Sequence, residues 1–201
     1  MLLPINPEHP EPRKVRRAVE ALEQGEVIAY PTDTVYAIGC DLFNKKAIDR
    51  IYQIKQMPKN HKLTFICPDL SDIARYAIVD NSQYRILRRI LPGPYTCVLE
   101  ATREVPKIVQ SKRKTIGIRV PNSPIIQAIV QELGRPVITS SALLPGEEFF
   151  IDPDEIDDRF VGLAMVLDGG VGGIEPTTVV DLSSGQVEVL REGAGPVAEL
   201  L

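Results

Sequence analysis

Apolar residues recur at helical intervals in five segments of the chain. In residues 11–25, Val15 and Leu22 fall on one helix face, and Gly25 follows where a left-handed cap is expected. The second segment opens on Asn44, a favoured N-cap residue. The remaining helical patterns cover residues 44–55, 69–79, 81–91 and 123–134.

Shorter apolar runs between these segments predict β-strands. Residues 177–193 contain two β-rich runs around Ser183–Gln186, which is typical of a hairpin. Helices that alternate with strands and end in a hairpin predict an α/β protein with a mixed sheet. The other expected strands are 27–30, 63–67, 95–101, 115–120, 136–142 and 163–170.

One segment lacks both patterns. Leu143–Asp158 combines glycine, prolines and acidic residues, and we expect an irregular loop that could act as a mobile flap. No internal repeat or long linker divides the chain, so the pattern favours one domain.

Composition limits the kinds of protein that this chain could be. The 201 residues are 44% hydrophobic, and no apolar run approaches the roughly 18 residues that a membrane span needs. The proline- and glutamate-bearing N-terminus does not resemble a signal peptide, so we expect a cytoplasmic protein that does not enter a membrane. Cys40, Cys67 and Cys97 are widely separated, which suits buried reduced thiols better than disulfides or a zinc site.

Charge is unevenly distributed along the chain, although the net charge is only −4. Residues 45–119 contain 16 Lys or Arg and 6 Asp or Glu, whereas residues 143–201 contain 2 and 13. The middle of the chain could therefore build a surface for phosphates, on a nucleotide or a nucleic acid. Basic residues scattered over solvated helix faces would give the same count.

Familiar catalytic signatures are absent from the sequence. It has no GxxxxGK[ST] loop, GxGxxG turn, HExxH helix or GxSxG elbow. Its histidines are His9, expected to be exposed, and His61, which suits either a ligand loop or a solvated turn. A histidine-based triad is therefore poorly supported.

Polar residues instead follow several predicted strands, where open α/β sheets commonly bind ligands. Arg119 lies among apolar strand residues, so its side chain must reach water or an anion. Lys55 ends a helix and suits either a phosphate contact or a solvated position. Thr177 and Thr178 could contact a ligand or only pack within a strand. Asp33, between Thr32 and Thr34, is expected to hold its loop through backbone hydrogen bonds.

Five motifs in order resemble the YrdC-like family of threonylcarbamoyl-adenylate synthases. They are YPTDTVYAIGCD, AIDRIYQIKQ, LPGPYTCVLEA, KTIGIRVP and EPTTVVDLSSGQVEVLREG, and the resemblance runs from about residue 12 to 195. KNHKLTFIC and LLPGEEF are most similar to the YciO branch. The resemblance implies a single-domain fold with a twisted, open mixed β-sheet, flanking helices and a concave basic cavity. It places the domain at 12–196, after an extension of 1–11 and before a tail of 197–201.

The family's reaction joins L-threonine, bicarbonate and ATP into threonylcarbamoyl-AMP and pyrophosphate, with ATP as substrate and Mg²⁺ as its expected partner. The product serves threonylcarbamoyladenosine modification of tRNA, so the resemblance also implies the tRNA threonylcarbamoyl-transfer machinery as a partner. Such chemistry needs alignment and charge neutralisation more than a protein nucleophile. Accordingly, no side chain is expected to act as acid, base, nucleophile or metal ligand.

The resemblance assigns each contact by position. Amino-acid contacts fall on Thr32, Thr34, Arg119 and Thr177. Nucleotide contacts fall on Lys55, His61, Ser140, Ser141, Ala142 and Arg191. The candidates for binding tRNA or double-stranded RNA are Lys59, Lys62, Arg88, Arg89, Lys112, Arg113 and Lys114.

Two positions depart from the synthase pattern. Met57 stands where a lysine-x-arginine pair has its arginine, and Leu143 where a serine-x-asparagine pair has its asparagine. Each lost contact would weaken ATP binding by about 1 to 3 kcal/mol. An alternative function is therefore an RNA-binding or tRNA-modification accessory protein with a weakened nucleotide site.

Overall fold

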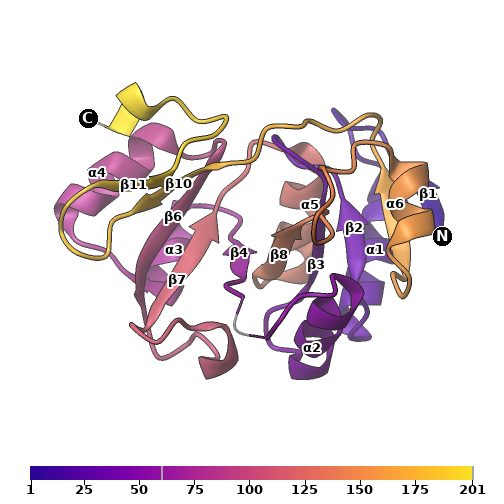
Figure 1. The fold of residues 1–201 in the computed structure, drawn as a ribbon, viewed down its shortest axis with the longest axis horizontal. Helices are drawn as coiled ribbons and strands as arrows, with labels where there is room; N and C mark the ends of the chain where they lie inside the picture. Colours follow the sequence, from indigo (N-terminus) through magenta and orange to yellow (C-terminus); the bar gives the residue numbers. More distant parts are fainter. Residues whose placement is uncertain (60, 201) are drawn as a thin grey trace.

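The computed structural model describes residues 1–59 and 61–200, and these residues form an α/β fold around one mixed sheet. The sheet has the strand order β1-β9-β2-β3-β8-β4-β7-β6-β10-β11, and β5 pairs with β6. Its two ends carry the two termini, which lie on opposite sides of the molecule in Figure 1. The strands are β1 (Leu2–Pro4), β2 (Ile28–Tyr30), β3 (Ala37–Asp41), β4 (Thr64–Ile66), β5 (Ala77–Ile78), β6 (Tyr95–Ala101), β7 (Thr115–Arg119), β8 (Val137–Ser141), β9 (Met165–Asp168), β10 (Thr178–Asp181) and β11 (Glu188–Arg191).

The helices follow the predicted apolar faces. Asn44 caps the second helix by accepting a hydrogen bond from the Ala47 backbone, and Gly134 ends the fifth in a left-handed conformation with φ of 69°. The α-helices are α1 (Pro12–Glu23), α2 (Lys45–Ile54), α3 (Leu70–Tyr76), α4 (Asn81–Ile90), α5 (Pro124–Leu133) and α6 (Pro153–Arg159). Short 3₁₀ helices are η1 (Lys107–Val109) and η2 (Val197–Leu200).

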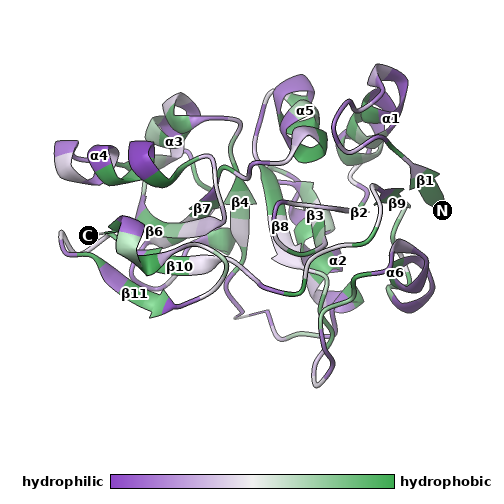
Figure 2. Ribbon diagram, turned by 90° about the horizontal axis from the view of Figure 1, so that it is seen from above, coloured by the Kyte–Doolittle hydropathy of each residue, from purple (hydrophilic) through white to green (hydrophobic). Residues whose placement is uncertain are grey.

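Buried apolar residues form two clusters against the sheet. Apolar residues of α1 and α5, which lie next to each other in Figure 2, form one cluster with Ile66 and Val137. Residues of α2, α3, α4 and α6 belong to the other cluster, with Phe65 and Ile118. Alternation along each strand therefore decides which side chains can meet on one face.

The terminal strands confirm the expected hairpin, and the sheet is mixed as predicted. β10 pairs antiparallel with β11 and parallel with β6. β4 pairs parallel with β7 but antiparallel with β8.

Three segments are more regular than the sequence pattern indicated. Ala37–Asp41 is a fully buried strand that the apolar pattern did not predict, because an interior strand shows no alternation. The expected flap Leu143–Asp158 contains the start of α6, capped by Asp152. Leu2–Pro4 pairs with β9, so the segment expected to precede the domain adds a strand to the sheet.

The C-terminal end is also packed. Val197–Leu200 forms η2, and Leu200 is buried in the core. The last residue of the predicted tail lies outside the described part of the chain.

Candidate functional site

A cavity of about 250 Å³ opens over the central strands. In the sheet register, Thr64 on β4 lies opposite both Gly117 on β7 and Thr139 on β8. These three residues therefore lie on the same face of their strands as Ile66 and Val137, which pack with α1 and α5. Because Gly117 has no side chain, the threonine methyl groups pack over it: a Cβ atom would lie 2.5 Å from Cγ2 of Thr64 and 3.3 Å from Cγ2 of Thr96. The wall also contains His61, Lys62, Thr96, Val98, Ser111, Thr115, Arg119, Ser140, Ser141, Thr177, Val179, Leu190 and Arg191.

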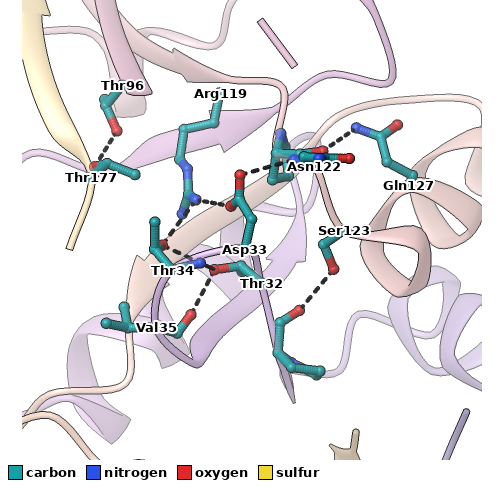
Figure 3. A network of polar contacts seen from close by, with 12 residues as sticks. Thr32, Asp33, Thr34, Val35, Thr96, Arg119, Asn122, Ser123, Gln127 and Thr177 are labelled. Atoms are coloured by element: carbon teal, nitrogen blue, oxygen red, sulfur yellow. Dashed lines mark hydrogen bonds and ion pairs between the residues drawn. The ribbon is translucent and has the colours of Figure 1, made fainter. Parts of the chain in front are cut away.

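Arg119, at the end of β7, is the centre of a polar network (Figure 3). Its Nη2 donates to Oδ1 of Asp33 at 2.9 Å and to Oγ1 of Thr34 at 3.2 Å. Oδ2 of Asp33 accepts a hydrogen bond from the Asn122 backbone at 2.9 Å. The Thr32 hydroxyl lies 3.1 Å from that of Thr34 and donates to a backbone carbonyl at 2.7 Å. Thr34 therefore contacts Arg119 directly, and Thr32 contacts Thr34.

Asp33 has a larger part than the sequence indicated. It was expected to accept only local backbone bonds, but its carboxylate forms a buried ion pair with an arginine 86 positions away. Burial lowers the pKa of Arg119, while the Asp33 carboxylate opposes that shift. The pair thus keeps a guanidinium charged in a site removed from water.

The hairpin contributes a second guanidinium. Arg191, at the end of β11, donates from Nη2 to the Thr177 carbonyl at 2.8 Å and to the Thr177 hydroxyl at 3.2 Å. That hydroxyl lies 2.8 Å from the hydroxyl of Thr96 on the adjacent strand. Desolvation lowers the pKa of Arg191. Thr177 is therefore fixed between two strands and an arginine, beside the cavity.

Lys55, directly after α2, is buried without a charged partner among the described residues. Its Nζ donates to the Ser140 hydroxyl and, at 2.6 Å, to the Ser141 carbonyl. Burial lowers its pKa to about 8. Ser140 and Ser141 line the cavity, so this ammonium group lies directly behind its wall.

His61 and Lys62 form another part of the wall and are exposed. Burial, then the positive charge of Lys55, lowers the pKa of His61. The imidazole is therefore neutral at pH 7 and offers hydrogen bonds rather than charge.

Thr32, Thr34 and Lys55 do not line the cavity, and three further positions singled out by the resemblance also lie off its wall. Ala142 is buried, and its backbone N–H already donates to the Tyr36 carbonyl at 2.7 Å. Met57 is partly buried and packs against the core. Leu143 is half-buried and its N–H donates to the Ser141 carbonyl at 2.9 Å.

The RNA-binding candidates are exposed but come from separate elements. Arg88 and Arg89 lie on α4, whereas Lys112–Lys114 lie between η1 and β7, on the opposite side of β7 in Figure 1. Lys59 forms an exposed ion pair with Asp49 at 2.7 Å. Lys62 alone among these candidates lines the cavity.

Sequence reasoning missed the hydroxyls in the strand interiors. Thr64, Thr96 and Thr139 all contribute to the wall, yet threonine is common in strands and gives no separate signal. Their shared face could have been found only from the pairing of β4, β6, β7 and β8. Alternation alone does not identify which strands are neighbours.

Among residues 1–59 and 61–200, no group of three or more His, Cys, Asp or Glu side chains is arranged to hold a metal ion. No helix in this part of the chain has the length and apolar character needed to cross a membrane.

The fold and cavity define an α/β protein with a cavity lined by arginine, lysine and hydroxyl side chains, groups that suit an anionic ligand. A family model described as Telomere recombination, the Sua5, YciO and YrdC family, matches residues 20–193. The chain belongs to this family, as the five motifs predicted.

Two relatives from this family match most of the chain. The YciO protein of Escherichia coli is 45% identical over 200 residues, which cover 98% of this chain and 97% of YciO. A threonylcarbamoyl-AMP synthase of Vibrio vulnificus is 32% identical over 184 residues, covering 89% and 98%.

Solved structures agree with this assignment. The crystal structure of E. coli YciO matches with a TM-score of 0.95 at 43% identity and covers 100% of this chain and 99% of that one. The structure of P. abyssi Sua5 complexed with L-threonine matches with a TM-score of 0.92 at 26% identity, covering 100% and 59%. The expected YrdC-like fold is therefore confirmed.

Proposed function

We propose that the protein is a threonylcarbamoyl-adenylate synthase-type enzyme, using L-threonine, bicarbonate and ATP. The observation that carries the proposal is the excess of positive charge at one cavity. Arg119 and Arg191 line it, Lys55 lies directly behind its wall, and Asp33 is paired with Arg119 alone. Relatives with 30 to 32% identity are named threonylcarbamoyl-AMP synthases.

The reaction would proceed in two balanced steps. The threonine amine forms an N–C bond with bicarbonate, and water leaves, giving a carbamate. A carbamate oxygen then attacks the α-phosphorus of ATP, and the bond to the bridging oxygen breaks so that pyrophosphate leaves. Both steps bring negative charges together, which the three cations would offset.

Each residue assigned to the site has a proposed role. Arg119, with Thr32, Thr34 and Thr177, would hold the amino acid, its guanidinium facing the carboxylate. Lys55 would face the phosphates. The rest of the nucleotide site would comprise His61, Ser140, Ser141, Ala142 and Arg191. Ala142 is buried off the cavity wall with its N–H bonded to Tyr36, so it would support the nucleotide site from behind rather than contact the nucleotide.

Magnesium would enter with ATP rather than in a site of the protein. Asp33 is the carboxylate beside the cavity, and both of its oxygens already accept hydrogen bonds, from Arg119 and Asn122. The residues present do not fit a resident Mg²⁺ site. The metal belongs to the substrate, where it would neutralise phosphate charge.

The product would pass to the tRNA threonylcarbamoyl-transfer machinery in the cytoplasm. The exposed cations Lys59, Lys62, Arg88, Arg89, Lys112, Arg113 and Lys114 are the proposed tRNA or double-stranded RNA contacts. An accessory, RNA-binding function is the second candidate, favoured by Met57 and Leu143.

The deciding measurement is pyrophosphate release from ATP with threonine, bicarbonate and Mg²⁺. We expect threonine-dependent release, slower than in a synthase with both motifs. Arg119→Gln should abolish it, whereas Arg103→Gln, an exposed arginine away from the cavity wall, should leave it unchanged. Absent turnover, with tight salt-sensitive tRNA binding, would favour the accessory function instead.

A further inference from the structure

A groove of about 470 Å³ opens between α3, α4 and α5, which lie along the same side of the sheet in Figure 2. Its volume is within the roughly 300 to 1,000 Å³ of small-molecule sites. In Figure 3, Asn122 of the groove and Thr177 of the cavity lie on opposite sides of Asp33, so the groove is separate from the cavity. Its apolar wall comprises Pro68, Leu70, Leu91, Pro92, Val120 and Pro121.

Tyr84 is the aromatic residue in the groove wall. Its side chain is 47% exposed, so the ring is not part of the hydrophobic core. Tyr84, Arg88 and Leu91 follow the i, i+4, i+7 spacing and therefore share one stripe of α4. Tyr84 and Leu91 line the groove, and the exposed Arg88 lies between them on this stripe. A cation therefore lies at the rim of the groove, next to an accessible ring.

The exposed surface of α4 is positively charged. Arg85, Arg88 and Arg89 are exposed, and the ion pairs found among the described residues involve none of them. Two carboxylates close by, those of Asp69 and Asp80, accept backbone hydrogen bonds as the N-caps of α3 and α4. The partner that fits this surface is a polyanion that also carries planar groups, which describes a nucleic acid.

We propose that the groove binds one unstacked base of a single-stranded RNA, which stacks on Tyr84 while Arg85, Arg88 and Arg89 contact the phosphates. Exposed aromatic rings beside a cationic surface bind single strands in this way. A double helix keeps its bases stacked inside, so it has no base to place in the groove. The inference rests on the RNA partner in the proposed function, and on no step of the synthase reaction.

A proline-rich protein segment fits the groove less well. Such segments bind grooves that aromatic side chains line, and their recognition needs no negative charge. Among the described residues, this wall has Tyr84 as its one aromatic side chain, and the three arginines would have no partner in such a complex. The charge of α4 therefore favours RNA.

The test measures the fluorescence anisotropy of a labelled oligoadenylate of about 10 nucleotides, a length within the site sizes of single-strand binding proteins. The full-length protein should bind it saturably. Tyr84→Ala should weaken the binding about tenfold, because it removes one base–aromatic stack. Tyr84→Phe keeps the ring and should bind as the unmodified protein does. So should Phe43→Ala, the matched control, because Phe43 is also aromatic and 50% exposed but lies outside the groove.

Arg88→Gln gives an independent readout. If Arg88 contacts a phosphate, the slope of log Kd against log salt should fall by about 0.7 for a single strand. Arg13→Gln, which removes an exposed arginine from α1, should leave the slope unchanged. Both arginines are exposed, so neither change should prevent folding. An unchanged slope in Arg88→Gln would overturn the phosphate contact.

The same RNA chain without its bases separates stacking from charge. It should bind the unmodified protein about tenfold more weakly than oligoadenylate does. Tyr84→Ala should weaken it no further, because the stack is already absent. The affinity for double-stranded RNA should likewise not depend on Tyr84. Equal losses for RNA with and without bases would overturn the inference, and so would equal losses in Tyr84→Ala and Phe43→Ala.

These outcomes are distinguishable from those that test the proposed function. Tyr84-dependent RNA binding without pyrophosphate release would leave the groove standing and remove the synthase reaction. Pyrophosphate release with the same RNA affinity in Tyr84→Ala and the unmodified protein would do the reverse. Absence of RNA binding would also overturn the inference, and Tyr84-dependent binding of a proline-rich peptide would then assign the groove to a protein partner.

Discussion

Asp33 and Arg119 form a buried ion pair at 2.9 Å, with side chains that are 10% and 7% exposed. The pair joins the loop after β2 to the end of β7, and Asp33 also holds the Asn122 backbone. One carboxylate therefore fixes both the shape of the loop and the orientation of the arginine proposed to hold threonine.

Asp33→Asn should lower the free energy of unfolding by about 3 to 5 kcal/mol, because it leaves the guanidinium buried without its counter-charge. Urea denaturation measures the change. Asp49→Asn is the control, since the Lys59–Asp49 pair is exposed and its loss costs about 0 to 1 kcal/mol. Equal losses in the free energy of unfolding would show that the buried Asp33–Arg119 pair stabilises the fold no more than the exposed Lys59–Asp49 pair does.

Stability should rise with pH above 8 because of Lys55. Its pKa is about 8 in the folded protein against 10.5 for an unperturbed lysine, so the folded state releases this proton first. Between these values the free energy of unfolding increases by up to about 3 kcal/mol. Lys55→Met should remove that rise. Denaturation curves from pH 7 to 10.5, compared between the two proteins, isolate this contribution from other titrating groups.

Anion binding should weaken over the same pH range in which the stability of the fold rises. Lys55 carries its charge below pH 8, so pyrophosphate affinity should fall as the pH rises through 8. His61 adds no charge in this range, because its pKa is lowered from 6.5. Calorimetric titration should give a pH-dependent Kd for the unmodified protein and a nearly constant, weaker one for Lys55→Met. A shared pH dependence would assign the titration to another group.

Gly39→Ala should destabilise the fold. The added Cβ would lie 2.4 Å from the Ile138 carbonyl oxygen, which is backbone and cannot move aside easily, and 2.6 Å from the Tyr30 hydroxyl. Overpacking of this kind costs about 1 to 3 kcal/mol. Gly39→Ala combined with Tyr30→Phe should stay destabilised, because the carbonyl contact remains. Recovery in the double variant would mean that the phenol alone sets the requirement for glycine.

The sequence predicted the elements in which apolar residues recur with a clear period. It did not predict elements in which burial on both faces removes that period. The α2 face and its Asn44 cap were predictable, whereas β3, buried on both faces, was not distinguished from the polar loop before it. The motifs placed Thr34 and Arg119 at one site. They did not reveal the Asp33–Arg119 pair, because the loop after β2 and the end of β7 are brought together by the sheet and lie far apart in the sequence.

Met57 and Leu143 provide the sharpest test of the nucleotide site. If they occupy the positions of the missing arginine and asparagine, Met57→Arg with Leu143→Asn should tighten ATP binding by about tenfold or more, through charge-assisted hydrogen bonds. Met57 packs against the core, so some loss of stability should accompany the change. Met57→Gln with Leu143→Asn controls for that loss without adding charge. Both positions lie off the cavity wall, so unchanged ATP affinity would show that the arginine cannot reach the phosphates. Higher affinity with faster pyrophosphate release would instead show that a weakened phosphate contact limits a functioning synthase site.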